Sequence, residues 1–175
     1  KVKFLANTNG ATMWFASNGA YYQFTRTIKS VDDVPISVID KRYGMISDKL
    51  PDSTETMMIK ASFVGANLNP QLVGVDKIDY KCNYFIGNNP NEWYTDVPNY
   101  TAVIYKEIYD GIDLKYYGNG TEMEYDFIIS PNADFSKIKT QYDGAESISI
   151  NDKGELIVQT KWGEDIEQRP NIYQK

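Results

Sequence analysis

The segment that decides the fold is Ile112–Phe127, IDLKYYGNGTEMEYDF, because its alternating residues predict a β-hairpin with two chemically different faces. Residues 118–121, GNGT, supply the turn chemistry that we assign to the loop. In that register the apolar pairs are Ile112 with Phe127, Leu114 with Tyr125, and Tyr116 with Met123. We expect this face to lie in the core of an antiparallel sheet.

The opposite face of the same hairpin carries four carboxylates and one lysine. The predicted register pairs Asp113 with Asp126, Lys115 with Glu124, and Tyr117 with Glu122. Two aspartates that face each other repel unless a cation lies between them. Ca²⁺ prefers oxygen ligands, so we take Asp113, Glu122, Glu124 and Asp126 as a candidate calcium site. The alternatives are the acid and nucleophile of a glycoside hydrolase, and a solvated sheet face balanced by Lys115 and basic residues of neighbouring strands.

The composition excludes several classes of function. The chain has 175 residues, which is the size of one domain, and we predict a single β domain over residues 1–175. It has no histidine and one cysteine, Cys82, so an ordinary zinc site, a histidine-based triad and an intrachain disulfide are not expected. The net charge of −6 opposes binding to nucleic acid. No apolar run approaches the roughly 20 residues of a membrane span, so we expect no direct membrane insertion.

Short runs rich in Val, Ile, Tyr, Phe and Thr recur along the chain between Gly, Asn, Asp and Pro clusters. They predict an all-β fold, an antiparallel β-sandwich-like domain of about a dozen strands with long ordered loops. Asn9-Gly10 and Asn18-Gly19 suit type I′ turns, and Asn151–Gly154 suits a final hairpin. Residues 29–55 are less periodic and predict a long loop or a peripheral hairpin. Asp134 can cap one helical turn that ends at Ile138.

Segments spread over almost the whole chain match one family pattern. They are Val2–Ala6 (VKFLA), Phe63–Asn67 (FVGAN), Asn83–Asn88 (NYFIGN), Trp93–Tyr100 (WYTDVPNY), Ile108–Gly118 (IYDGIDLKYYG) and Glu124–Pro131 (EYDFIISP), followed by Asp143–Ala145 and Arg169-Pro170. The chain thereby resembles a bacterial domain of unknown function that lies N-terminal to SBBP-type β-propeller repeats in large surface and secreted proteins. The resemblance implies an extracellular or cell-surface location and no known reaction. An opening ENxGQ-like segment of that pattern is missing, which implies a start just inside the domain.

An Asn-rich segment holds three aromatic residues, Trp93, Tyr94 and Tyr100. Flat rings stack on sugars while amides bond hydroxyl groups, so these three residues form a candidate glycan site. The alternative is that the tryptophan anchors a loop by packing. Trp14 lies in an apolar strand, and Cys82 reads as a small buried hydrophobic residue.

These observations favour a non-catalytic extracellular or cell-surface module, structural or interacting, of a larger multidomain bacterial protein. The expected partners are neighbouring domains of the same polypeptide, a glycan or a surface protein. The alternatives are a carbohydrate-binding module and, further, a carboxylate-based glycoside hydrolase. We expect no enzyme activity and no cofactor unless the acidic face takes Ca²⁺.

Overall fold

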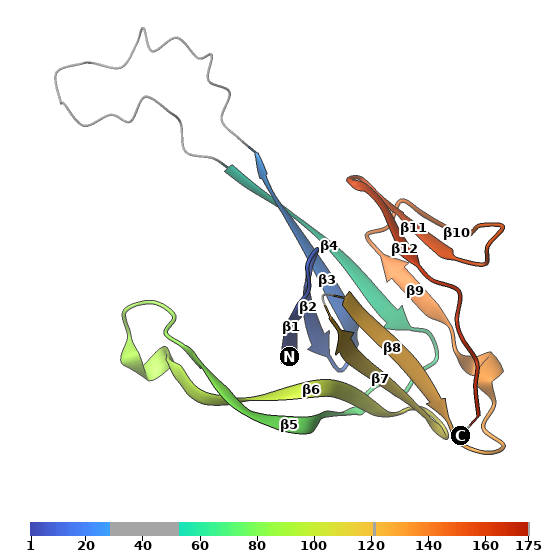
Figure 1. The fold of residues 1–175 in the computed structure, drawn as a ribbon, viewed down its shortest axis with the longest axis horizontal. Coiled ribbons are helices and arrows are strands. Elements are labelled where there is room, and N and C mark those ends of the chain that lie inside the picture. Colours follow the sequence, from blue (N-terminus) through green and yellow to red (C-terminus); the bar gives the residue numbers. More distant parts are fainter. Residues whose placement is uncertain (29–52, 121, 175) are drawn as a thin grey trace, which may run out of the picture.

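The computed structural model describes residues 1–28, 53–120 and 122–174, and these form twelve strands and two short 3₁₀ helices (Figure 1). The five-stranded sheet has the order β1-β2-β3-β4-β9, with β1 (Val2–Asn7), β2 (Thr12–Ala16), β3 (Gly19–Ile28), β4 (Ser53–Phe63) and β9 (Thr140–Asp143). The four-stranded sheet has the order β5-β6-β7-β8, with β5 (Gln71–Tyr84), β6 (Tyr94–Tyr109), β7 (Ile112–Asn119) and β8 (Glu122–Ile129). The third sheet is β10 (Ser147–Ile150), β11 (Leu156–Thr160) and β12 (Gly163–Glu167).

The core lies between the five-stranded and four-stranded sheets. Its buried cluster takes Met13, Phe15 and Ala20 from the first sheet and Tyr105, Ile108, Tyr109, Ile112, Leu114 and Tyr116 from the second. All strand pairs are antiparallel. The predicted all-β, antiparallel, sandwich-like fold of about a dozen strands is therefore confirmed. Within the described ranges, no helix is long and apolar enough to cross a membrane.

Strict alternation explains which side chains enter this core. In β2, Met13 and Phe15 are buried, whereas Trp14 between them points to the opposite face of the sheet. In β7, Ile112, Leu114 and Tyr116 are buried, as expected from the sequence. Each buried residue of this kind contributes on the order of 2 kcal/mol of hydrophobic stabilisation, which fixes the orientation of both strands.

The predicted register of the β7–β8 hairpin is wrong by two residues. Leu114 lies opposite Phe127, Tyr116 opposite Tyr125, and pairing continues to Asn119 opposite Glu122. A shift of two keeps every residue on its predicted face, because side chains alternate with period two. The division into an apolar and an acidic face is therefore confirmed, although the individual pairs differ.

The turn predictions have mixed outcomes. Asp134 caps the 3₁₀ helix η3 (Phe135–Lys137) and accepts a hydrogen bond from the Ser136 amide at 3.1 Å, as expected. The Asn151–Gly154 turn joins β10 to β11, also as expected. The type I′ assignments are wrong, because Asn9, Gly10 and Asn18 lack positive φ angles.

Residues 29–52 of the predicted loop or hairpin, 29–55, lie outside the described residues. Residues 53–55 belong to β4 and pair with residues 26–28 of β3, which fits the hairpin alternative and not the loop. The structure also shows why position 19 is glycine. A Cβ at Gly19, where φ is +136°, would lie 2.3 Å from the carbonyl oxygen of Ala61 on the neighbouring strand.

The third sheet attaches to the sandwich through a carboxylate. Glu167 of β12 accepts a 2.6 Å hydrogen bond from the Tyr125 hydroxyl and another from the Tyr142 hydroxyl. Desolvation, followed by the Glu167 charge, raises the pKa of both phenols. These hydroxyl groups therefore remain protonated donors, and the contact is a structural one.

Candidate functional site

Among the described residues, the distal half of the β5–β6 hairpin stands apart from the sandwich. Strand β6 pairs with β7 from Ala102 to Tyr109, whereas its residues 94–100 pair with β5. We call residues 76–98 the arm. Figure 1 shows it extending away from the two packed sheets, in green and yellow-green. A two-stranded ribbon without a second layer is marginally stable by itself, so the core at its base must hold the arm.

The arm exposes a concentration of large apolar and aromatic side chains. Tyr80, Phe85, Ile86 and Tyr94 are each more than 60% exposed, and Tyr84 and Trp93 are also exposed. Between Cys82 and Asp96 the only charged residue is Glu92. Soluble monomers rarely gather exposed apolar side chains in this way unless the surface contacts another molecule. The arm is therefore the strongest candidate for a binding element.

Local contacts give the tip of the arm a defined shape. The Trp93 indole Nε1 donates to the Gly87 carbonyl oxygen at 3.2 Å, and the Trp93 ring meets the Phe85 ring edge-on at a centroid distance of 5.2 Å. The 3₁₀ helix η2 (Pro90–Glu92) is capped by Asn89, which accepts from the Asn91 amide at 3.1 Å. The exposed rings are thus held before any partner arrives, which lowers the entropic cost of binding.

A bulge marks the middle of the arm. Asp96 has a φ of 56°, and its amide donates to the Asn83 side-chain oxygen at 2.8 Å. Its carboxylate contacts the Lys81 ammonium at 3.2 Å. Bulges and charges of this kind hinder indiscriminate pairing at a strand edge. Cys82, which we expected to be buried, is only partly buried beside the Asn99 side chain.

The structure separates the three residues of the predicted glycan site. Trp93 and Tyr94 lie at the tip, but Tyr100 lies at the base of the arm. Its ring meets Phe4 edge-on at 5.9 Å and covers Gly74, where a Cβ would lie 2.5 Å from the ring. Tyr100 therefore packs against the sandwich, and the three aromatics do not form one platform.

The four carboxylates of the predicted calcium site do share the outer face of β7–β8. The observed register sets Asp126 opposite Lys115 and Asp113 opposite Ile128, so the predicted Asp113–Asp126 pair is wrong. Glu124 lies opposite Tyr117, and Glu122 lies at the end of the hairpin opposite Asn119. The charge repulsion that suggested a bridging cation is thus absent from that pair.

Asp113 is held by a bulge in β6. Its carboxylate accepts from the Glu107 amide at 2.8 Å and contacts the Lys106 ammonium at 2.6 Å. Glu107 has a φ of 50°, where the β6–β7 register shifts between Tyr105 and Tyr109. Asp113 therefore satisfies a backbone amide that the bulge removes from the regular ladder.

The other carboxylates have separate partners. The Asn119 side-chain nitrogen donates to Glu124 at 2.6 Å, and this bond, together with one from Tyr117, lowers the pKa of Glu124. The Tyr117 hydroxyl also lies 3.4 Å from Asp126. Desolvation and these carboxylates raise the pKa of Tyr117 to about 12, so it stays a donor at neutral pH. Among residues 1–28, 53–120 and 122–174, no three acidic, histidine or cysteine side chains are grouped to hold one metal ion.

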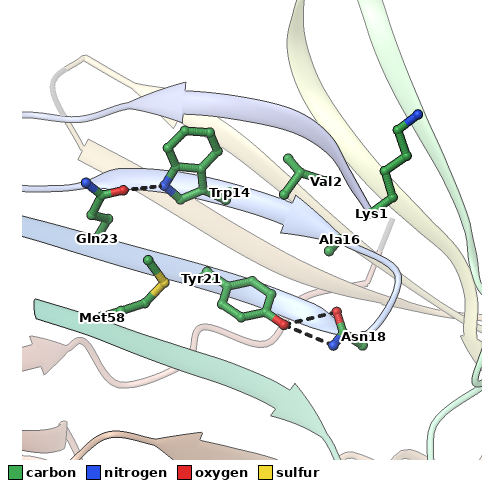
Figure 2. Close-up of a pocket in the computed structure, with 8 residues that line it drawn as sticks. All are labelled: Lys1, Val2, Trp14, Ala16, Asn18, Tyr21, Gln23 and Met58. Atoms are coloured by element: carbon green, nitrogen blue, oxygen red, sulfur yellow. Dashed lines mark hydrogen bonds between the residues drawn. The ribbon is translucent and has the colours of Figure 1, made fainter.

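The sequence reasoning missed a shallow hollow on the outer face of the five-stranded sheet (Figure 2). Its volume is about 420 Å³, and its lining residues are Lys1, Val2, Trp14, Ala16, Asn18, Tyr21, Gln23 and Met58. The sequence predicts that Trp14 belongs to an apolar strand, and it lies in β2. The alternation of Met13, Trp14 and Phe15 could have placed Trp14 on the face opposite the core, because two of three consecutive apolar residues must share a face.

The chain belongs to the family described as a domain of unknown function, DUF7948, whose model matches residues 1–175. No curated protein and no solved structure matches it.

Proposed function

We propose that this DUF7948 domain is a non-catalytic interaction module of a larger bacterial protein, and that the arm is its contact element. The observation that carries the proposal is the exposed aromatic tip of an otherwise unsupported hairpin. The partner we propose is a neighbouring domain of the same polypeptide or another surface protein. The resemblance of the sequence to domains that precede SBBP-type repeats supports an extracellular or cell-surface location.

The chemistry of the tip supports a protein partner. Tyrosine, tryptophan and phenylalanine are enriched at the centres of protein interfaces, where charged residues are depleted. The tip has this composition, with Tyr84, Phe85, Trp93 and Tyr94 in a segment whose only charge is Glu92. The Trp93 contacts with Phe85 and Gly87 keep the tip ordered, so a partner would meet a preformed surface.

The test is photo-crosslinking in the full-length parent protein on intact cells. A photoreactive phenylalanine analogue replaces Ile86 at the tip or, as the matched control, Leu68, which is 87% exposed but lies outside the arm. We expect Ile86 to form one defined adduct with protein and Leu68 to form little. Mass spectrometry of the crosslinked peptide then distinguishes a domain of the same chain from a separate surface protein.

Equal and diffuse labelling from positions 86 and 68 would contradict the proposal, because the arm would then be no more engaged than any exposed residue. A second variant tests whether the adduct depends on the exposed rings of the tip. Phe85→Ser combined with Tyr94→Ser should abolish the adduct formed from position 86, since it removes two of the exposed rings without touching the core.

A further inference from the structure

We infer that the hollow on the outer face of the five-stranded sheet binds a neutral saccharide, with Trp14 as its stacking surface. This site lies on β1, β2, β3 and β4, so the inference is independent of the proposed role of the arm. The proposed carbohydrate site therefore differs from the predicted site at Trp93, Tyr94 and Tyr100, which the fold separates.

Strand pairing places the key side chains together. Trp14 of β2 lies directly opposite Tyr21 of β3, and Gln23 of β3 lies opposite Met58 of β4. Residues that face each other across an antiparallel pair share one side of the sheet, and here that side is the one opposite the core. Figure 2 shows the two rings on this side of the sheet, with Gln23 beside Trp14 and Asn18 beside Tyr21.

Hydrogen bonds fix the polar groups around the rings. The Trp14 indole Nε1 donates to the Gln23 side-chain oxygen at 2.9 Å, which orients the Gln23 amide along the edge of the indole. The Asn18 side-chain nitrogen donates to the Tyr21 hydroxyl at 2.9 Å. Amides and a phenol at the edges of an aromatic ring are suited to the hydroxyl groups of a sugar that stacks on that ring.

The two rings have different roles. The Lys60 ammonium lies 5.7 Å from the centroid of the Tyr21 ring, so this ring already has a cation–π partner. Trp14 is half-buried and lines the hollow together with the small side chain of Ala16. We therefore assign stacking to Trp14 and hydrogen bonding to Gln23, Asn18 and the Tyr21 hydroxyl.

The lining also indicates the charge of the ligand. Among the described residues that line it there is no carboxylate, and the one charged residue is Lys1, which Figure 2 shows extending away from the sheet. Aromatic, amide and aliphatic groups together match an uncharged polyhydroxylated ring better than an ion or a charged peptide. The volume of about 420 Å³ falls within the range of roughly 300 to 1,000 Å³ typical of small-ligand sites.

The test is affinity gel electrophoresis of the purified domain in gels that contain hydroxyethyl cellulose, laminarin, dextran or galactomannan, with alginate as an anionic comparison. We expect at least one neutral polymer to retard the domain. Trp14→Val should weaken that binding about tenfold or more, because the stacking surface is lost while a good strand former is kept. Trp93→Val, the matched control in the arm, should leave it unchanged.

A second variant separates loss of binding from loss of folding. Gln23→Leu keeps the size of the side chain and removes the amide, and it should weaken binding several-fold while thermal unfolding stays that of the original domain. Circular dichroism checks the fold of each variant. If the Trp14→Val variant unfolds, the affinity of the Gln23→Leu variant for the neutral polymer decides the question.

Four results of the gel assay would overturn the inference. They are no retardation by any neutral polymer, retardation by alginate alone, binding that survives both Trp14→Val and Gln23→Leu, and binding that Trp93→Val removes. A photoreactive group at Met58 that forms a protein adduct on cells would assign the hollow to a polypeptide instead.

Discussion

The two halves of β6 belong to one strand and pair with the same neighbour, yet their surroundings are opposite. Tyr105 and Ile108, in the half that contacts the five-stranded sheet, are 0% and 1% exposed, whereas Tyr94 in the arm is 64% exposed. Tyrosines occur in both halves, so the composition of the strand does not set this difference. The five-stranded sheet does, because it covers one half of β6 and ends before the other.

We infer different roles for the two halves of β6, stability for the core half and binding for the arm half. Burial of apolar area stabilises the core half of β6. The arm half buries little apolar area and exposes its rings to solvent, so burial stabilises it little. We therefore expect changes in the core half and its neighbours to reduce stability strongly. Changes in the arm should affect binding instead.

Leu114→Ala is expected to have the largest effect. Leu114 is fully buried opposite Tyr105 on the neighbouring strand, so its truncation should leave a cavity and lower the free energy of unfolding by about 2 to 5 kcal/mol. Urea denaturation measures this. Leu68→Ala, at a position that is 87% exposed, is the matched control and should cost less than about 0.5 kcal/mol. Equal losses would show that the buried face does not carry the stability.

Alkaline pH should also lower the free energy of unfolding, because of the tyrosines in the core. Desolvation raises the pKa values of Tyr22, Tyr105 and Tyr116 above those of an unfolded chain. Their contribution to stability is therefore complete below about pH 10 and falls as pH rises further, since only the unfolded state then loses protons readily. At pH 11 the three together should cost about 4 kcal/mol.

Urea denaturation from pH 8 to pH 11 measures this slope, and tyrosinate absorbance follows the ionisation. A variant without the arm lacks Tyr80, Tyr84 and Tyr94, and its slope should change little, because these three side chains are exposed. A flat stability profile up to pH 11 would mean that the core phenols ionise without unfolding.

Removal of the arm should have the smallest effect on stability. Ile78 and Asn99 are paired, so an Asn-Gly turn can replace residues 79–98 between them. We expect the free energy of unfolding to change by less than about 1 kcal/mol, because the removed side chains bury little surface. A loss comparable to that of Leu114→Ala would show that the arm packs as part of the core and would remove the contrast between the halves of β6.

The sequence predicted the faces of the hairpin better than its pairs. Leu114 and Tyr116 alternate with charged residues, and that alternation requires the apolar side to be buried. It does not distinguish registers that differ by two residues, because both place the same side chains on each face. The observed register extends pairing to Asn119 and Glu122, into the segment expected to be a loop.

The candidate sites were harder to predict, because exposure depends on which strands are covered. Trp93 and Tyr94 were recognised as candidates, but Tyr100 was grouped with them although it packs on Gly74 and Phe4. Asp113 was assigned to a cation, whereas its carboxylate binds the Glu107 amide of a bulge on another strand. Nothing local to Asp113 indicates that bulge.

By itself the sequence determined the fold class, the buried face of β7 and the Asp134 cap, because alternation and capping depend on residues close together in the chain. Only the tertiary structure decided that the aromatics of the arm are exposed, that Trp14 borders a hollow and that Asp113 holds a bulge. All three depend on which segments, far apart in the sequence, cover or approach one another. A local sequence pattern does not specify that arrangement, because it reflects only residues close together in the chain.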